Sequence, residues 1–123
     1  HDISPLINGT RNARSPYKAF YYYNQRELHA VRSGPWKLFL PLKDIARHPH
    51  YRKDQPVTPL LFNVEKDIAC KTNVAAEHPD IVKRLTGLAE KARADLGDND
   101  RPGKGQRPIG TVKDPKPQKL SAR

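Results

Sequence analysis

The sequence contains no methionine, begins with a histidine and has a single cysteine. Because a translated chain begins with methionine, we expect the N-terminus to be processed, cut or truncated, and the chain to be the end of a longer protein. One cysteine, Cys70, excludes an internal disulfide and leaves the redox compartment undetermined. No apolar run approaches the ~20 residues needed to span a bilayer, and no secretory apolar segment follows the first residue. The residues alone therefore predict no membrane span.

Positive charge dominates the sequence. The 123 residues carry 23 Lys or Arg against 13 Asp or Glu, which gives a net charge of +10. The basic excess lies mainly in residues 10–53 and in the last segment, 98–123. A chain this basic favours an anionic partner. Its length suits one domain of modest core.

Short runs rich in aromatic and β-branched residues, bounded by turn signals, predict four strands. The two connections among the first three strands are too short to join parallel neighbours, so the sheet is predicted to be antiparallel. A stretch with apolar residues at helical spacing follows, with Pro79 at its first position and Gly97 just after its end. The strands are expected at residues 17–24, 27–33, 36–40 and 60–64, and the helix at residues 79–96.

The predicted fold class is therefore α+β: a small four-stranded antiparallel sheet packed with one C-terminal helix and followed by an irregular basic tail. Simple alternation in the second strand predicts that Leu28, Ala30 and Arg32 share one face. In the third strand it predicts Trp36, Leu38 and Leu40 on one face, with Lys37 and Phe39 on the other.

Seven of the nine aromatic residues fall within residues 17–40, with Arg and Lys between them. Such a surface could stack nucleic-acid bases and hold phosphates, but the Gly-aromatic motif of RNA-recognition sheets is absent. The other interpretation is structural: one helix covers one sheet face only, so aromatic side chains on the second face would form an interface with a missing partner.

The segment HPHYRK, residues 48–53, places His48 and His50 close together behind Arg47. Zinc sites need three or four ligands, so we predict no metal site here. Contact of these three residues with an anionic substrate is one interpretation, and a solvated basic loop is the other. Cys70 is either activated by neighbouring lysines or a passive, half-buried thiol. No catalytic residue is assigned, because no nucleophile–base, paired-carboxylate or phosphate-loop pattern is present.

Four segments, in order, resemble the C-terminal part of arylsulfatase-type sulfatases. They are HDISPLING, FYYYNQRELHAVRSGPWKLFL, PLLFNVEKDIACKTNVA and HPDIVKRLTGLAEKARADLG. The second is similar to the family's aromatic stretch followed by Ala-Val-Arg-x-Gly-x-x-Lys, and the third to its Leu-Tyr-Asp-Leu-x-x-Asp-Pro-x-Glu-x-x-Asn-Leu. Ile68 stands where the family often has Pro, and Cys70 where it often has Glu. The resemblance covers roughly residues 1–97.

This resemblance implies a domain division. Residues 1–16 would be the end of, or the linker from, a missing N-terminal catalytic domain. Residues 17–97 would be the sheet and helix subdomain, and residues 98–123 a flexible tail rich in Pro, Gly and Lys. In such enzymes the small sheet packs on the catalytic domain. Arg32 and the 47–53 loop would then lie at the rim of a cleft for a sulfated substrate.

The resemblance also implies an activity for the parent protein, which would hydrolyse sulfate esters. The family uses a calcium ion and a formylglycine made from the Cys of Cys-x-Pro-Ser-Arg, both upstream of the region present here. Cys70 lies in Ala-Cys-Lys-Thr, so this chain is expected to hold no cofactor and not to be catalytic alone. A periplasmic or extracellular location is suggested by resemblance only. The rival hypothesis is a stand-alone basic aromatic binding module for nucleic acid or sulfated polysaccharide, and the resemblance makes nucleic acid the less favoured partner.

Overall fold

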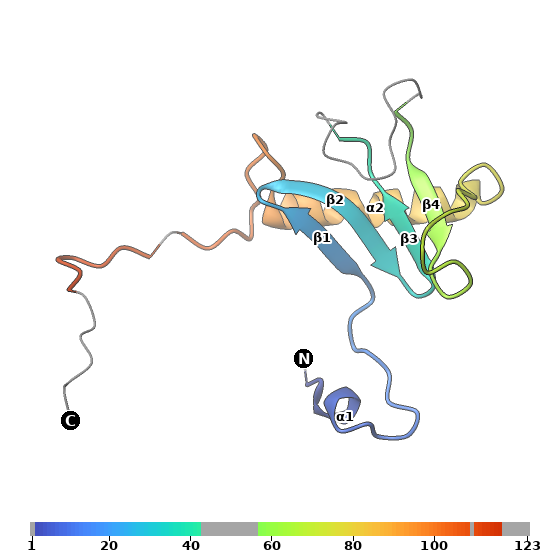
Figure 1. Ribbon diagram of the computed structural model, residues 1–123. Coiled ribbons are helices and arrows are strands. Elements are labelled where there is room, and N and C mark those ends of the chain that lie inside the picture. The colour runs from blue at the N-terminus through green and yellow to red at the C-terminus, as the bar shows by residue number, and fades with distance from the viewer. Residues whose placement is uncertain (1, 43–56, 109, 117–123) are drawn as a thin grey trace.

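The computed structural model describes residues 2–42, 57–108 and 110–116. A four-stranded antiparallel sheet in the order β1-β2-β3-β4 packs against one long helix, α2 (Figure 1). The predicted α+β fold is confirmed. The strands are β1 (Phe20–Asn24), β2 (Glu27–Ser33), β3 (Trp36–Phe39) and β4 (Leu60–Asn63). A short helix, α1 (Ser4–Ile7), lies away from the sheet and was not predicted.

Two-residue turns join the first three strands. Gln25 adopts φ 55° in the first turn, and Gly34 adopts φ 59° in the second. Glycine at the first central position of a two-residue hairpin is favoured because it reaches positive φ without steric cost. Pro35 follows, and its carbonyl accepts the N–H of Val64 at 2.8 Å, which ties this turn to the end of β4. The turn signals in the sequence therefore positioned the meander correctly.

The helix α2 spans Pro79–Leu96, as predicted. Pro79 occupies the first turn, where its missing N–H costs nothing. His78 precedes the helix but makes no side-chain capping bond. Its ring instead packs at 4.8 Å, centroid to centroid, from that of Trp36 on β3. Gly97 ends the helix at φ 88°, a conformation that side chains rarely adopt.

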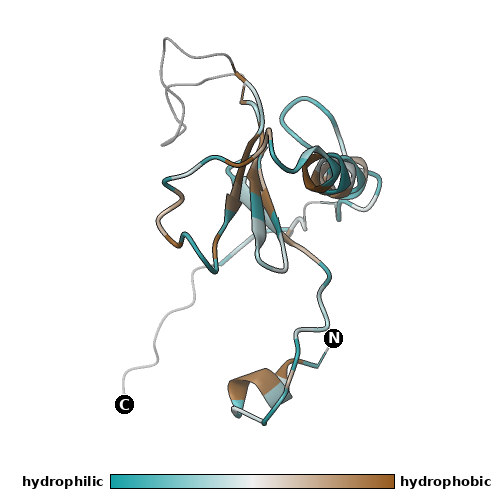
Figure 2. Cartoon of the chain, turned by 90° about the vertical axis from the view of Figure 1, so that its right-hand side faces the viewer, coloured by the Kyte–Doolittle hydropathy of each residue, from teal (hydrophilic) through white to brown (hydrophobic). Residues whose placement is uncertain are grey.

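Apolar side chains of the sheet pack against apolar side chains of α2, and Figure 2 shows that the helix covers one face of the sheet only. The buried core between them is formed by side chains of β2, β3, β4 and α2 and by Leu40, which follows β3. Its residues are Leu28, Val31, Leu38, Leu40, Leu61, Leu85, Ala89 and Ala92. Each of these side chains is at most 4% exposed. The predicted alternation in β3 is confirmed, because Leu38 and Leu40 face the helix whereas Lys37 and Phe39 lie on the other side.

The predicted alternation in β2 is wrong. Tyr22 pairs with Ala30, but Tyr23 pairs with Leu28, so the register shifts and His29 is the extra residue. A bulge of this kind restarts the alternation on its far side. Leu28 therefore points to the helix together with Val31, and Ala30 lies on the opposite face. Without the bulge, one of the two most buried side chains of β2 would face away from the core.

The outer edge of β4 is closed by the chain that follows it. The Oδ1 atom of Asn73 accepts the N–H of Leu61 at 3.0 Å and that of Ala75 at 3.1 Å. The N–H of Val74 donates to the carbonyl of Leu61 at 2.9 Å. Backbone groups that an edge strand would leave unpaired are thus satisfied within the chain.

The segment after α2 differs from the expected flexible tail in its first part. Residues 98–106 fold back on the end of the helix, where Lys104 and Gly105 donate backbone N–H groups to the carbonyls of Ala94 and Asp95. The N–H of Asn99 reaches the carbonyl of Arg26 at 2.7 Å in the β1–β2 turn. The helix end is thereby attached to the sheet.

Candidate functional site

The predicted substrate-proximal residues, Arg47, His48 and His50, lie outside the described residues, as does most of the loop between β3 and β4. The remaining site candidates belong to the sheet. On the face of the sheet that α2 leaves uncovered, Phe20 and Tyr22 are exposed.

Two rows of side chains cross this uncovered face, set by the strand register. One row runs Phe20, Arg32, Lys37, Phe62, and the other Tyr22, Ala30, Phe39, Leu60. At the β4 end both rows are covered, because Val64 and Cys70 of the following turn pack against the cluster of Ala30, Phe39 and Phe62. At the β1 end, no segment of the described chain covers the two rows as fully.

The uncovered end of the two rows forms what we call the aromatic patch: Tyr17, Phe20 and Tyr22, with Arg32 and Lys37 beside them. The three rings are 46%, 49% and 40% exposed. The rings of Tyr17 and Phe20 lie 6.1 Å apart. Large, clustered apolar exposure of this kind marks an interaction surface, whereas single exposed apolar residues do not.

The cation of Lys37 is positioned by the patch itself. Its Nζ atom lies 4.6 Å from the ring centroid of Tyr22 and 4.6 Å from that of Phe39. Attraction to two ring faces fixes an otherwise mobile amine over the sheet. Arg32, its neighbour in the register, donates its Nε–H to the carbonyl of Gly34 at 3.2 Å. The patch therefore combines apolar rings with two oriented cations, a composition suited to a protein surface that offers apolar and acidic groups.

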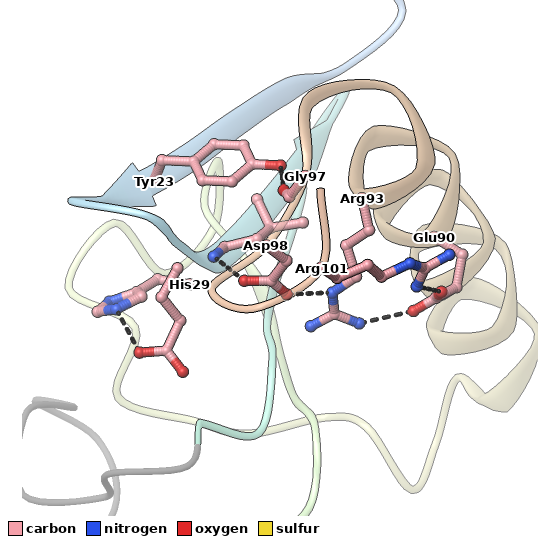
Figure 3. A network of polar contacts seen from close by, with 9 residues as sticks. Tyr23, His29, Glu90, Arg93, Gly97, Asp98 and Arg101 are labelled. Carbon is pink, nitrogen blue, oxygen red and sulfur yellow. Dashed lines mark hydrogen bonds and ion pairs between the residues drawn. The ribbon is translucent and has the colours of Figure 1, made fainter. Parts of the chain in front are cut away.

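A second group of polar side chains, at the junction of α2 with the hairpin, was missed by sequence reasoning (Figure 3). Asp98 accepts the N–H of Leu28 through Oδ1 and that of Arg93 through Oδ2. Glu90 accepts bonds from Arg93 at 2.6 Å and from Arg101 at 2.9 Å. The hydroxyl of Tyr23 donates to the carbonyl of Gly97 at 2.9 Å. We call these side chains the junction network.

The pKa shifts in the junction network indicate that its charged groups stabilise the fold. Hydrogen bonds from Arg101 and then Arg93 lower the pKa of Glu90. Burial would lower the pKa of Arg93, but its bonds to Glu90 and Asp98 outweigh that effect and raise it. Burial raises the pKa of Tyr23, and the charge of Asp98 adds to the rise. Both carboxylates of the junction network are thus held by guanidinium groups.

A cavity of about 430 Å³ lies beside this network. Its lining residues are Glu27, Pro41, Glu90, Arg93, Asp98, Asn99, Asp100 and Arg101. Within residues 2–42, 57–108 and 110–116, no three His, Cys, Asp or Glu side chains gather in a way that could hold a metal ion. Glu90 and Asp98, two of the four carboxylates in this lining, are paired with arginines.

Cys70 has the environment of a passive thiol. It is partly buried against the apolar cluster of β3 and β4, and this burial raises the pKa of its thiol, with the charge of Lys37 opposing the effect. A raised pKa keeps the sulfur protonated and unreactive at neutral pH. The interpretation of Cys70 as a half-buried, unreactive residue is therefore the one that the structure supports.

Sheet, helix and their order along the chain define a small α+β domain. A family model described as the C-terminal region of aryl-sulfatase matches residues 15–109, and the chain belongs to this family. A solved protein of Bacteroides thetaiotaomicron, labelled 6S-sulf and described with the metabolism of multiple glycosaminoglycans, has a similar fold. Its TM-score is 0.57 at 22% identity, over 76% of this chain and 19% of that one.

The present chain thus spans about a fifth of the length of that solved protein. A search of curated proteins gave no match. In the part of the chain that the structure describes, no helix combines the length and the apolar character that crossing a membrane requires.

Proposed function

We propose that this chain is the C-terminal subdomain of an arylsulfatase-type sulfuric ester hydrolase, and that it packs its aromatic patch on the catalytic domain. The family match over residues 15–109 supports the identity of the parent enzyme. The exposure of Phe20 and Tyr22, on the one sheet face that α2 does not cover, supports the docking surface. Burying two such rings would contribute favourably to the association of the two domains.

The chemistry belongs to the catalytic domain in this proposal. Family members use a formylglycine and a calcium ion, and the described residues of this chain fit neither. Cys70 lies in Ala-Cys-Lys-Thr rather than Cys-x-Pro-Ser-Arg. The carboxylates of Glu90 and Asp98 are held by Arg93 and Arg101. Alone, the chain would hydrolyse no sulfate ester.

Its contribution to catalysis would be indirect. Arg32 and Lys37 place two cations beside the docking surface, and Arg47, His48 and His50 remain proposed contacts to the sulfated substrate at the rim of the cleft. Positive charge at such a rim raises the local concentration of anionic substrates and falls in effect as salt is added.

The test is sulfate release by the full-length enzyme over a panel of aryl and carbohydrate sulfate esters. Two variants separate docking from folding. Phe20→Asp combined with Tyr22→Asp places two charges in the aromatic patch, and is expected to reduce activity and loosen the two domains. Ile68→Asp is the control, because Ile68 is 89% exposed in the turn after β4 and outside the patch.

Activity on no ester of the panel would refute the proposed reaction. Full activity and unchanged domain association in the Phe20/Tyr22 double variant would refute the proposed docking surface. The rival hypothesis of a stand-alone binding module has no observation in its favour that the sulfatase proposal does not also explain.

A further inference from the structure

A groove of about 610 Å³ runs along the exposed side of α2, beside the start of β1 and the end of β2. Four of the eight residues that line it are basic, and one is acidic. The lining residues, which we call the basic groove, are Lys18, Ser33, Asp80, Lys83, Arg84, Gly87, Leu88 and Lys91.

In the part of the chain that the structure describes, no carboxylate forms an ion pair with a cation of the basic groove. Among residues 2–42, 57–108 and 110–116, none of Lys18, Lys83 and Lys91 takes part in an ion pair. On the same helix, by contrast, Arg93 is paired with both Glu90 and Asp98. Unpaired cations gathered around a hollow create a positive potential that attracts anions.

One of these cations is held in place by the fold. Arg84 donates from Nη1 to the hydroxyl of Ser33 at 3.1 Å, and that hydroxyl donates to the carbonyl of Lys18 at 2.8 Å. The bond to Ser33 links α2 to the sheet and orients the guanidinium at the groove, so less side-chain freedom would be lost on binding an anion.

The floor of the groove carries no side chain at Gly87. Gly87 lies in the middle of α2, where glycine weakens a helix relative to alanine. A Cβ atom built there would meet nothing within 4 Å, so packing inside this chain does not require glycine. The residue leaves depth between Lys83 and Lys91, and the aliphatic stems of those lysines, with Leu88, supply apolar walls.

We propose that the basic groove binds a sulfated polysaccharide chain. The choice of a sulfated ligand rests on the proposed function, and the position of the site rests on the residues that line the basic groove. Lys83 and Lys91 are eight residues apart on a helix, or about 12 Å along its axis, which suits a ligand with several separated anionic groups. Apolar walls suit sugar rings, and among the described residues no aromatic side chain lines the groove to stack a nucleic-acid base. The groove lies on the helix side of the sheet, whereas Phe20 and Tyr22 of the aromatic patch lie on the other face.

The experiment measures binding of dextran sulfate to the full-length enzyme at several salt concentrations, with dextran as the uncharged control. Lys83→Ser combined with Lys91→Ser is expected to weaken binding about tenfold, since two exposed ion contacts are lost. The slope of log affinity against log salt should become shallower by about two. Lys71→Ser combined with Lys113→Ser removes the same charge outside the groove and should leave affinity unchanged.

A second variant tests the groove without removing a cation. Gly87→Glu adds a better helix former at an open position, so the protein is expected to fold, and it places an anion on the groove floor. We expect it to weaken dextran sulfate binding more than Ala76→Glu, which adds the same charge outside the groove. Circular dichroism checks that both variants keep their helix.

Unchanged affinity in both groove variants would overturn the inference. Tighter binding of single-stranded DNA or of polyglutamate than of dextran sulfate would also overturn it, in favour of another anionic partner. Sulfate release by the wild-type enzyme is measured in parallel. If the enzyme releases no sulfate but still binds dextran sulfate through Lys83 and Lys91, the proposed function is refuted and the groove is supported as an anion site.

Discussion

The carboxylate of Asp98 accepts the backbone N–H of Leu28 at 3.0 Å, across 70 residues of sequence. Leu28 sits next to the bulge in β2 and is fully buried, so its N–H has no access to water. The same carboxylate holds Arg93 of α2. One side chain thus satisfies a buried donor of the sheet and connects it to the end of the helix.

This double role predicts a large effect of removing the Asp98 side chain. Asp98→Ala leaves the buried N–H of Leu28 and the guanidinium of Arg93 without their acceptor, and should lower the free energy of unfolding by about 2–4 kcal/mol. Asp98→Asn keeps an acceptor oxygen for Leu28 and should cost about half as much. Urea unfolding followed by Trp36 fluorescence measures both, with the exposed Asp114→Ala as control. Equal stability of Asp98→Ala and wild type would contradict this role.

The pH dependence of stability should report Glu90. Hydrogen bonds from Arg101 and Arg93 lower the pKa of its carboxyl in the folded protein. A group with a depressed folded pKa stabilises the fold above its unfolded pKa, and that contribution disappears as the pH falls through the folded pKa. Wild type should therefore be more stable than Glu90→Gln at neutral pH, and the difference should shrink on acidification through the titration range of glutamate. A difference that stays constant or grows on acidification would show that Glu90 is not held in this way.

Asn73 offers a test of how the sheet edge is closed. Its Oδ1 atom accepts two backbone N–H groups, from Leu61 in β4 and from Ala75. Asn73→Ala removes both bonds and should destabilise the fold by about 1–2 kcal/mol. Asn73→Asp keeps the acceptor oxygens and should retain most of the stability. Thermal unfolding compares the two, and hydrogen exchange of the Leu61 amide should quicken in the alanine variant alone. Identical behaviour of the two variants would refute the capping role.

The local parts of the fold could be predicted because their signals are local. Pro79, the apolar stripe and Gly97 define α2 within one stretch of chain, and the prediction of residues 79–96 matches the structure. Gly34 marks the β2–β3 turn in the same way. The bulge at His29 could not be predicted, because it is defined by which residues of β1 face β2, and alternation within one strand carries no such information.

The candidate sites show the same limit. The aromatic content of residues 17–40 predicted an exposed ring-bearing face, but not that the turn carrying Val64 and Cys70 would cover its β4 half. The junction network joins Asp98 to Leu28 through tertiary contact alone. A charged pair flanking Gly97, Arg93 before it and Asp98 after it, was the one sequence signal that could have indicated the network. The basic groove combines residues from the segment before β1, from β2 and from α2, and only the packed structure brings them together.

Hydroxyl-radical footprinting of the full-length protein tests most directly whether the aromatic patch is an interface. Ile68, 89% exposed, and Phe62, 2% exposed, serve as standards for free and buried side chains within the same sample. If the patch docks on a catalytic domain, Phe20 and Tyr22 should be modified as little as Phe62. Modification in proportion to their 49% and 40% exposure in this chain would show that no domain covers them and would contradict the account.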